Sequence, residues 1–190
     1  MSNSTDKDLF KLLGKFEQQQ KMPPVESWHP EVEGEIDINI DSQGRWFHEG
    51  GHFDRQDLAR MFASILRRDG DDYYLVTPAE KLKIRVQDVP FSIVLMSERQ
   101  GGLNFITSLG DEVEMGGDHP LEFRKNPQSR AQSSPQSQKE SAEFIPYIMI
   151  RNNLWAKLNQ STYYELINLV QETAEGYVLR SKDYEVVIPE

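Results

Sequence analysis

The sequence predicts an α+β fold made of two related β-β-α-β-β units, with extra antiparallel strands between them. Three observations lead to this prediction. A helical apolar stripe stands between segments in which apolar and polar residues alternate, short turns separate those segments, and the same order of elements returns near the C-terminus. We expect an N-terminal arm at residues 1–24, a first unit at 25–88 and a second unit at 89–190.

Composition restricts the class of protein. The chain has 190 residues, and 37% of them are hydrophobic. It has no cysteine, and its formal net charge is −10. Disulfides and thiol chemistry are excluded, and the negative charge repels polyanions, so no general nucleic-acid binding is expected. No apolar run reaches the roughly 18 residues of a membrane helix, and the first residues do not resemble a secretion signal. We therefore expect a cytoplasmic protein that does not bind membranes.

A strand, a turn and a second strand open the first unit. Ile36, Ile38 and Ile40 alternate with polar residues, which predicts a strand with one buried face. The Ser-Gln-Gly turn that follows leads into residues 45–48 as the second strand of a hairpin. Segments 73–76 and 82–86 are expected to form another hairpin after the helix.

The most fully specified element is a predicted helix over residues 55–69. Its apolar residues recur at intervals of three and four and share one face: Leu58, Met61, Phe62, Ile65 and Leu66. Asp54 is expected to cap the first turn, and Gly70 to follow the last turn in a left-handed conformation.

The second unit repeats this order. Strands are expected at 147–151 and 154–158, then a helix capped by Ser161, then strands at 177–180 and 184–188. The helix has apolar residues at the spacing of the first helix: Tyr163, Leu166, Ile167 and Val170. The alternative to duplication is chance recurrence of a common pattern.

Three further segments differ from the repeated pattern. The extra antiparallel strands between the units are predicted at 90–96, 103–108 and 121–124. Residues 125–142 are rich in glutamine, serine and proline, which predicts a mobile loop. Residues 9–16 have leucine and phenylalanine at helical spacing, which predicts an amphipathic arm that either lies on its own domain or binds a partner.

The sequence from His48 to His52 matches the zinc-protease pattern H-E-x-x-H. In that pattern both histidines bind the metal from one helical turn, whereas each glycine inside a helix costs about 1 kcal/mol. Gly50 and Gly51 therefore favour a strand that ends in a glycine connection, and no metal site is expected. A zinc hydrolase is the third alternative for the function, and it needs a third ligand such as His119 or a carboxylate.

Other enzyme motifs are missing from the sequence. It has no Gly-x-Ser-x-Gly elbow, no phosphate-binding loop and no dinucleotide fingerprint. We therefore expect a protein that is not an enzyme, with no catalytic residue and no cofactor.

Basic and aromatic residues are the candidates for binding. Lys81, Lys83 and Arg85 share one face of a predicted strand, and a cationic surface can receive phosphate or carboxylate. The alternative is a solvated face that nearby carboxylates neutralise. Trp46 and Trp155 can stack a planar ligand or can fill the core.

Several longer motifs resemble the bacterial family called domain of unknown function 1285. They are residues 23–30 (PPVESWHP), 46–50 (WFHEG), 58–69 (LARMFASILRRD), 74–81 (YLVTPAEK) and 86–91 (VQDVPF), with shorter matches at 110–111, 119–121 and 151–156. The resemblance implies a duplicated α+β core, a C-terminal half superficially similar to the pleckstrin-homology fold, and a nucleotide-like ligand at the interface of the halves with a role in signal transduction. Two features depart from the family: His52 is not typical of its position, and the loop at 125–142 looks like an insertion.

The leading functional hypothesis is a non-catalytic protein that binds a small anionic or nucleotide-like ligand where its two units meet. The expected ligand-binding residues come from the motifs of the resemblance: Trp46, His48, Glu49, Arg67, Arg68, Lys81, Arg151 and Trp155. The runner-up is a protein-interaction module with no small ligand, which binds a protein partner through a sheet edge or through the N-terminal arm.

Overall fold

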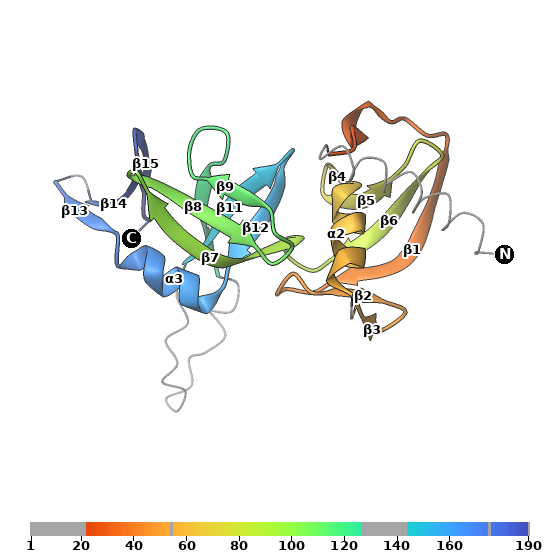
Figure 1. Ribbon diagram of the computed structural model, residues 1–190, viewed down its shortest axis with the longest axis horizontal. Helices are drawn as coiled ribbons and strands as arrows, with labels where there is room; N and C mark the ends of the chain where they lie inside the picture. The colour runs from red at the N-terminus through yellow and green to blue at the C-terminus, as the bar shows by residue number, and fades with distance from the viewer. Residues whose placement is uncertain (1–21, 54, 127–143, 175, 190) are drawn as a thin grey trace. The chain divides into compact units, whose positions relative to one another are not determined.

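The computed structural model describes residues 22–53, 55–126, 144–174 and 176–189. Its contacts divide the chain into unit one, Met1–Asp88, and unit two, Val89–Glu190 (Figure 1). The predicted N-terminal arm and most of the predicted loop at 125–142 lie outside the described residues, as does the expected helix cap Asp54.

Within its described residues, unit one contains one sheet of six strands, one α-helix and one short 3-10 helix. In chain order the elements are η1 (Val25–Ser27), β1 (Val32–Ile40), β2 (Trp46–His48), β3 (Gly51–His52), α2 (Gln56–Ser64), β4 (Leu66–Asp69), β5 (Asp72–Val76) and β6 (Glu80–Val86). The strand order is β3-β2-β1-β6-β5-β4. Only the central pair in this order, β1 and β6, runs parallel; the other neighbours are antiparallel.

Helix α2 lies across one face of this sheet (Figure 1). The inward-facing strand residues include Ile38 and Ile40, which are fully buried, and Ala59 and Ala63 are the buried residues of the helix. Alternation with polar neighbours is what gives β1 one buried face, as the sequence predicted.

The predicted helix over 55–69 is wrong in its last third. α2 ends at Ser64, and Leu66–Asp69 forms the edge strand β4, which pairs with β5 from Leu66↔Leu75 to Asp69↔Asp72. Ile65 and Leu66 are buried as expected, because a strand that begins at the sheet edge can bury the same side chains as another helical turn. Gly70 does have a positive φ of 63°, but it serves the β4–β5 hairpin.

Unit two contains a second six-stranded sheet and a smaller three-stranded sheet. Its elements are β7 (Phe91–Arg99), β8 (Gly102–Thr107), β9 (Glu112–Glu114), β10 (Leu121–Lys125), β11 (Phe144–Arg151), β12 (Leu154–Leu158), α3 (Gln160–Ile167), β13 (Gln171–Thr173), β14 (Gly176–Ser181) and β15 (Tyr184–Val187). The larger sheet has the order β10-β11-β12-β7-β8-β9. Its core includes the fully buried side chains Phe91, Ile93, Phe105, Ile148 and Leu154.

The two six-stranded sheets share one topology. In each unit the first three strands form one antiparallel meander and the last three form another. The first and last strands then pair in parallel at the centre, as β1 with β6 and as β7 with β12. The predicted α+β class and the predicted duplication are confirmed.

The helices do not follow the repeat of the strands. α2 connects the third and fourth strands of unit one, whereas α3 follows the sixth strand of unit two. The prediction that the helix after Ser161 takes the place of the first helix is therefore wrong. The cap of α3 also differs from the prediction, since Asn159 accepts a hydrogen bond of 2.9 Å from the backbone N–H of Thr162.

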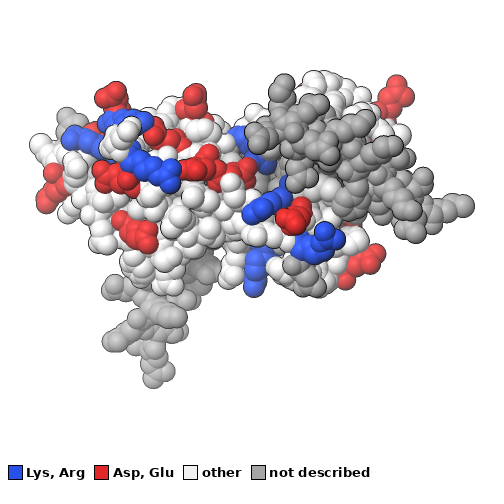
Figure 2. Space-filling model, viewed as in Figure 1, with Lys and Arg blue, Asp and Glu red and all other residues white. Residues whose placement is uncertain are grey.

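Ser181 attaches the small sheet to the larger sheet of unit two. Its hydroxyl donates to the carbonyl of Met115 at 2.8 Å and accepts from the backbone N–H of Leu103 at 3.0 Å. In this part of unit two, charged side chains of both signs lie interspersed on the surface (Figure 2). They include the pairs Lys182–Glu114, Arg180–Glu185 and Arg99–Glu112. Among the described residues, no helix is both long enough and apolar enough to cross a membrane.

Candidate functional site

An irregularity in β1 interrupts the central strand pair of unit one. Glu35 is paired with Lys83, but the next pair is Asn39 with Arg85, so β1 advances by four residues while β6 advances by two. The extra residues locally separate the two strands and re-aim their side chains. Bulges of this kind are over-represented next to functional sites.

Two cavities lie at this irregularity and share two of their lining residues, Asp37 and Arg85. The larger has a volume of about 570 Å³ and is lined by Asp37, Asn39, Asp41, Phe47, Gly50, Arg85 and Gln87. The smaller has a volume of about 340 Å³ and is lined by Glu35, Ile36, Asp37, Lys83, Ile84 and Arg85. We call the two cavities together the β1–β6 groove.

An ion pair between Asp37 and Arg85 lies where the two cavities meet. Both side chains are well exposed, at 52% for Asp37 and 73% for Arg85. In the smaller cavity Lys83 pairs with Asp72 at 2.8 Å, and this hydrogen bond raises the pKa of Lys83. The side chain of Glu35, opposite Lys83, makes no hydrogen bond or ion pair with any residue that the structure describes.

The larger cavity combines an aromatic ring with two side-chain amides. Phe47 lies half-buried on β2, and the guanidinium of Arg45 stands 5.9 Å from its ring centre. Gln87 accepts a hydrogen bond of 3.3 Å from the backbone N–H of Ser42, which leaves its amide NH₂ group for a ligand. The amide of Asn39 has no hydrogen-bond partner within the described part of the chain.

Asp41 fixes the turn at the end of the groove. Its carboxylate accepts from the backbone N–H of Gln43 at 2.9 Å, from that of Arg45 at 3.0 Å and from the Arg45 side chain at 2.7 Å. Burial alone would raise the pKa of Asp41, but these hydrogen bonds outweigh burial and hold the pKa below its usual value. The Asp41 carboxylate therefore stabilises the turn, and its hydrogen bonds are used there and not for a ligand.

The histidines of the H-E-x-x-H segment lie on opposite faces of a hairpin. Cross-strand partners share a face, and the partners are Phe47 with His52 and His48 with Gly51. The His52 ring stands 5.4 Å from the ring of Phe47, whereas the His48 ring stands 6.3 Å from that of Phe53. One metal ion cannot take both side chains, so this segment lacks the arrangement that the zinc-hydrolase alternative requires.

Glu49 and Gly50 make the turn of this hairpin. Their φ angles are +48° and +78°, the signs that a type I′ turn requires. Glu49 is thus at an exposed turn, on the same hairpin as His48 but not beside the other predicted site residues. Trp46 is buried and packs at 6.3 Å from Phe53, which fits core filling, although its Nε1–H has no hydrogen-bond partner among the described residues.

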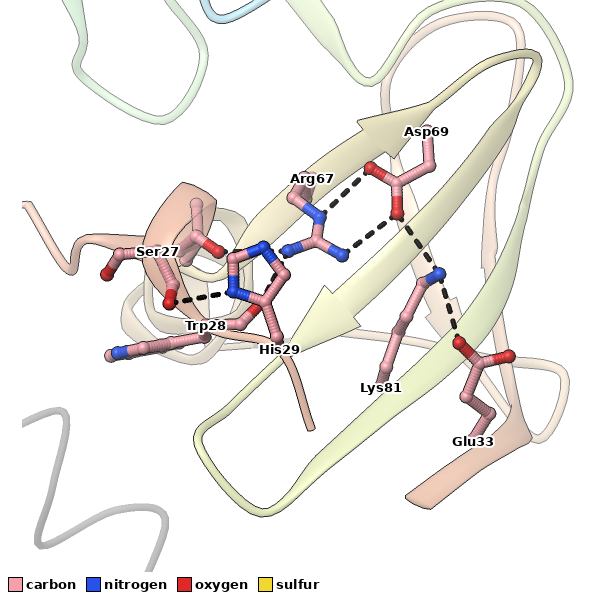
Figure 3. A network of polar contacts seen from close by, with 8 residues as sticks. Ser27, Trp28, His29, Glu33, Arg67, Asp69 and Lys81 are labelled. Atoms are coloured by element: carbon pink, nitrogen blue, oxygen red, sulfur yellow. Dashed lines mark hydrogen bonds and ion pairs between the residues drawn. The ribbon is translucent and has the colours of Figure 1, made fainter. Parts of the chain in front are cut away.

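Arg67 and Lys81 meet at one carboxylate (Figure 3). Arg67 donates two hydrogen bonds to Asp69, at 3.0 and 2.9 Å, and two more to the carbonyls of Val25 and Trp28. Lys81 bridges Asp69 and Glu33 at 3.1 and 3.2 Å. The structure brings these two predicted residues together, but their charges are already used to fasten η1 and β1 to the edge of the sheet.

The other two predicted arginines, Arg68 and Arg151, also form ion pairs within the protein. Arg68 projects to the other face of β4 from Arg67, where it lies 5.5 Å from the ring of Tyr73 and 3.6 Å from Asp71. In unit two, Arg151 pairs with Asp111 at 2.6 Å and stands 5.0 Å from the ring of Phe91.

Trp155 of unit two is buried and already stacked. Its Nε1–H donates to Asn153 at 2.9 Å, and the guanidinium of Arg124 stands 4.6 Å from its ring and 4.5 Å from that of Tyr147. The Arg124 guanidinium thus stacks on the Trp155 ring, where the sequence suggested a planar ligand. A shared site of Arg151 and Trp155 with the residues of unit one stays a prediction.

Sequence reasoning missed most of the groove. Lys83 and Arg85 were recognised as cations on one strand face, but Asp37, Asn39 and Phe47 were regarded only as the polar or aromatic positions of ordinary strands. Strict alternation hides a bulge, because the extra residues of β1 do not break the pattern of isoleucines. Gly50 and Gly51 were the available sequence signal for the hairpin that borders the groove, and the structure has its turn at Glu49 and Gly50.

These features define a class: an α+β protein of two units with the same sheet topology, one of which has a polar groove at its central strand pair. Residues 23–89 match the N-terminal domain of the domain of unknown function DUF1285, and residues 90–185 match the C-terminal domain of that family. The chain belongs to the DUF1285 family.

Two solved structures agree with this assignment. A DUF1285 family protein from Silicibacter pomeroyi DSS-3 is 33% identical to the chain, with a TM-score of 0.75 over 86% of this chain and 85% of that one. A DUF1285 family protein from Shewanella baltica OS155 is 27% identical, with a TM-score of 0.51 over 69% of this chain and 90% of that one. A search of the curated proteins gave no match.

Proposed function

We propose that this chain is a non-catalytic binding protein and that unit one takes a small polar ligand in the β1–β6 groove. The observation that carries the proposal is the interrupted pairing of β1 and β6 beside two joined cavities. Their volumes fall in the usual range for small-molecule sites, and the side chains of Asn39 and Glu35, which have no hydrogen-bond partner among the described residues, line them.

The composition of the groove supports a polar ligand of mixed character. An aromatic ring and two amides line one end, and charges of both signs line the other. The anionic ligand expected from the sequence finds less support, because each expected cation already faces a carboxylate: Arg67, Arg68, Lys81 and Arg151. The nucleotide-like part of that prediction remains one of the ligand types to test.

Chemical-shift mapping on the isotopically labelled full chain tests the proposal. A library of small polar molecules, including nucleosides and nucleotides, is titrated while amide signals are followed. We expect the shifts caused by any ligand to cluster in residues 35–41, 46–50 and 83–87. The substitution Asn39→Leu removes an amide from the larger cavity and should weaken binding at least tenfold.

Asn104→Leu provides the matched control, since Asn104 is a half-buried strand asparagine of unit two. It should leave the affinity of the groove unchanged. Ligands that shift only amides of unit two, or that bind Asn39→Leu as tightly as the natural chain, would reject the groove as the site.

A further inference from the structure

We infer that the ligand of the β1–β6 groove is a zwitterion of the α-amino-acid class, with its carboxylate on Arg85 and its ammonium group on Asp37 and Glu35. This inference rests on the proposed function and names the ligand of the same site. Three properties of the groove lead to it: an exposed ion pair, carboxylates in excess beside it, and a neighbouring cavity lined by an aromatic ring and two side-chain amides.

The ion pair between Asp37 and Arg85 is open to exchange. Both side chains are more than half exposed, and exposed pairs of this kind contribute little to stability. A ligand that replaces Asp37 at Arg85 therefore displaces a weak contact. A carboxylate can take two parallel hydrogen bonds from the guanidinium, which is the stronger geometry.

The charges around this pair select against a simple anion. Among the cations at the described part of the groove, Arg85 has the most exposed side chain, at 73% against 41% for Lys83 and 56% for Arg45, so its ion pair is the one most open to a ligand. A lone anion at Arg85 would be repelled by Glu35 and by the displaced Asp37. A lone cation would leave Arg85 without a partner, whereas a zwitterion satisfies both signs in one molecule.

The neighbouring cavity suits the side chain of such a ligand. Phe47 provides an apolar ring, and Asn39 and Gln87 provide amide groups that can donate or accept. A planar side chain, aromatic or carboxamide, can pack on the ring and bond to the amides at the same time. Free phenylalanine, tyrosine and glutamine are therefore the probes of choice.

The test compares each free amino acid with two capped forms, using isothermal titration calorimetry on the full chain. The N-acetyl form lacks the ammonium group, and the primary amide form lacks the carboxylate. We expect at least one free amino acid to bind and each cap to weaken it tenfold or more. Caps that leave the affinity unchanged would overturn the inference.

Two substitutions assign the charges to their partners. In Arg85→Gln the free amino acid and its primary amide should bind equally weakly, because the carboxylate has lost its partner. In Asp37→Asn the penalty for N-acetylation should shrink. Arg99→Gln is the matched control, since Arg99 is also exposed and paired with one carboxylate, Glu112, and it should bind as the natural chain does.

The outcome separates the inference from the proposed function. If amino acids fail to bind but other molecules shift the groove amides, the zwitterion is wrong and the site stands. If nothing shifts those amides, both are rejected. Because the pair is exposed, thermal unfolding midpoints of the variants should match that of the natural chain, which shows that lost binding is not lost folding.

Discussion

Arg67 shows how a single cation can join three parts of unit one. Its side chain is only 10% exposed, and its guanidinium forms a two-bond contact with Asp69 and donates to two backbone carbonyls of the η1 region. Those carbonyls come from a segment about 40 residues away in the chain, so one side chain anchors the entry of unit one to the sheet edge.

Replacing Arg67 by methionine should destabilise the chain by about 3 kcal/mol, because it removes two hydrogen bonds from Asp69 and one from each of two backbone carbonyls. Urea unfolding followed by tryptophan fluorescence measures this change. Arg60→Met is the control: Arg60 is 50% exposed and lies 3.9 Å from Asp57, so its loss should change the free energy of unfolding by less than about 0.5 kcal/mol. Equal effects of the two substitutions would contradict the anchoring role.

Asp69 should make the stability of the chain depend on pH. Burial by itself would raise its pKa, but hydrogen bonds and charge from Arg67 and Lys81 outweigh burial and lower the pKa below the usual 3.8. The folded state therefore favours the ionised form. The resulting stabilisation is fully present above the unfolded pKa and is lost as the pH falls through the lower folded pKa.

Asp69→Asn should accordingly be less stable than the natural chain near pH 7, and the difference should shrink below about pH 4. Unfolding curves from pH 7 down to pH 3 measure it. Asp57→Asn serves for comparison, because the Asp57 side chain is 81% exposed. A stability gap that stays constant down to the lowest pH would show that Asp69 gains no stability from its charge.

Among the elements, β1 is the one whose irregularity matters most. Its N-terminal half pairs with β6 in one register and its C-terminal half in another. If the register that pairs Glu35 with Lys83 continued, Asp37 would pair directly with Arg85, whereas the change of register pairs Arg85 with Asn39. The two cavities lie at this change of register, and the buried face at Ile38 and Ile40 is retained.

Helix α3 begins at a different cap from the one that its sequence suggests. The Asn159 side chain accepts from both the backbone N–H and the hydroxyl of Thr162, each at 2.9 Å, whereas the Ser161 hydroxyl only donates to Asn159. Since the preferred capping residues overlap, the sequence leaves two candidates two residues apart.

Asn159→Ala should lower the free energy of unfolding by about 1 kcal/mol, as expected for loss of a side-chain cap. Ser161→Ala should lower it by less than about 0.5 kcal/mol. Thermal or urea unfolding of both variants decides between the caps. A larger loss in Ser161→Ala would restore the cap that was expected from the sequence.

At the scale of the molecule, the strands of the repeat are retained while its helices have diverged. Both units keep two three-stranded meanders joined at a parallel central pair. Unit one inserts α2 between the meanders, and unit two adds α3 and a small sheet after them. This arrangement explains why a helix-based alignment of the halves was misleading even though the duplication itself was correctly predicted.

The sequence predicts strands better than it predicts the site. Alternation over Ile36, Ile38 and Ile40 places β1 correctly because a half-buried strand imposes that period. The spacing from Leu58 to Leu66 extends the helix too far, because a helical stripe and the start of an edge strand can bury the same residues. Charged residues such as Arg67 attract attention as binding groups, while their actual partners depend on tertiary pairing that sequence spacing does not encode.

The parallel central pair also sets the order in which each unit can fold. The sheet of unit one is complete only when β1 pairs with β6. These two strands are the first and the last of the unit in the sequence. Contacts between distant residues slow folding, because the intervening chain must be closed before they form. On the ribosome, unit one must therefore emerge through Val86 before its sheet can close, so its folding follows translation of nearly the whole unit.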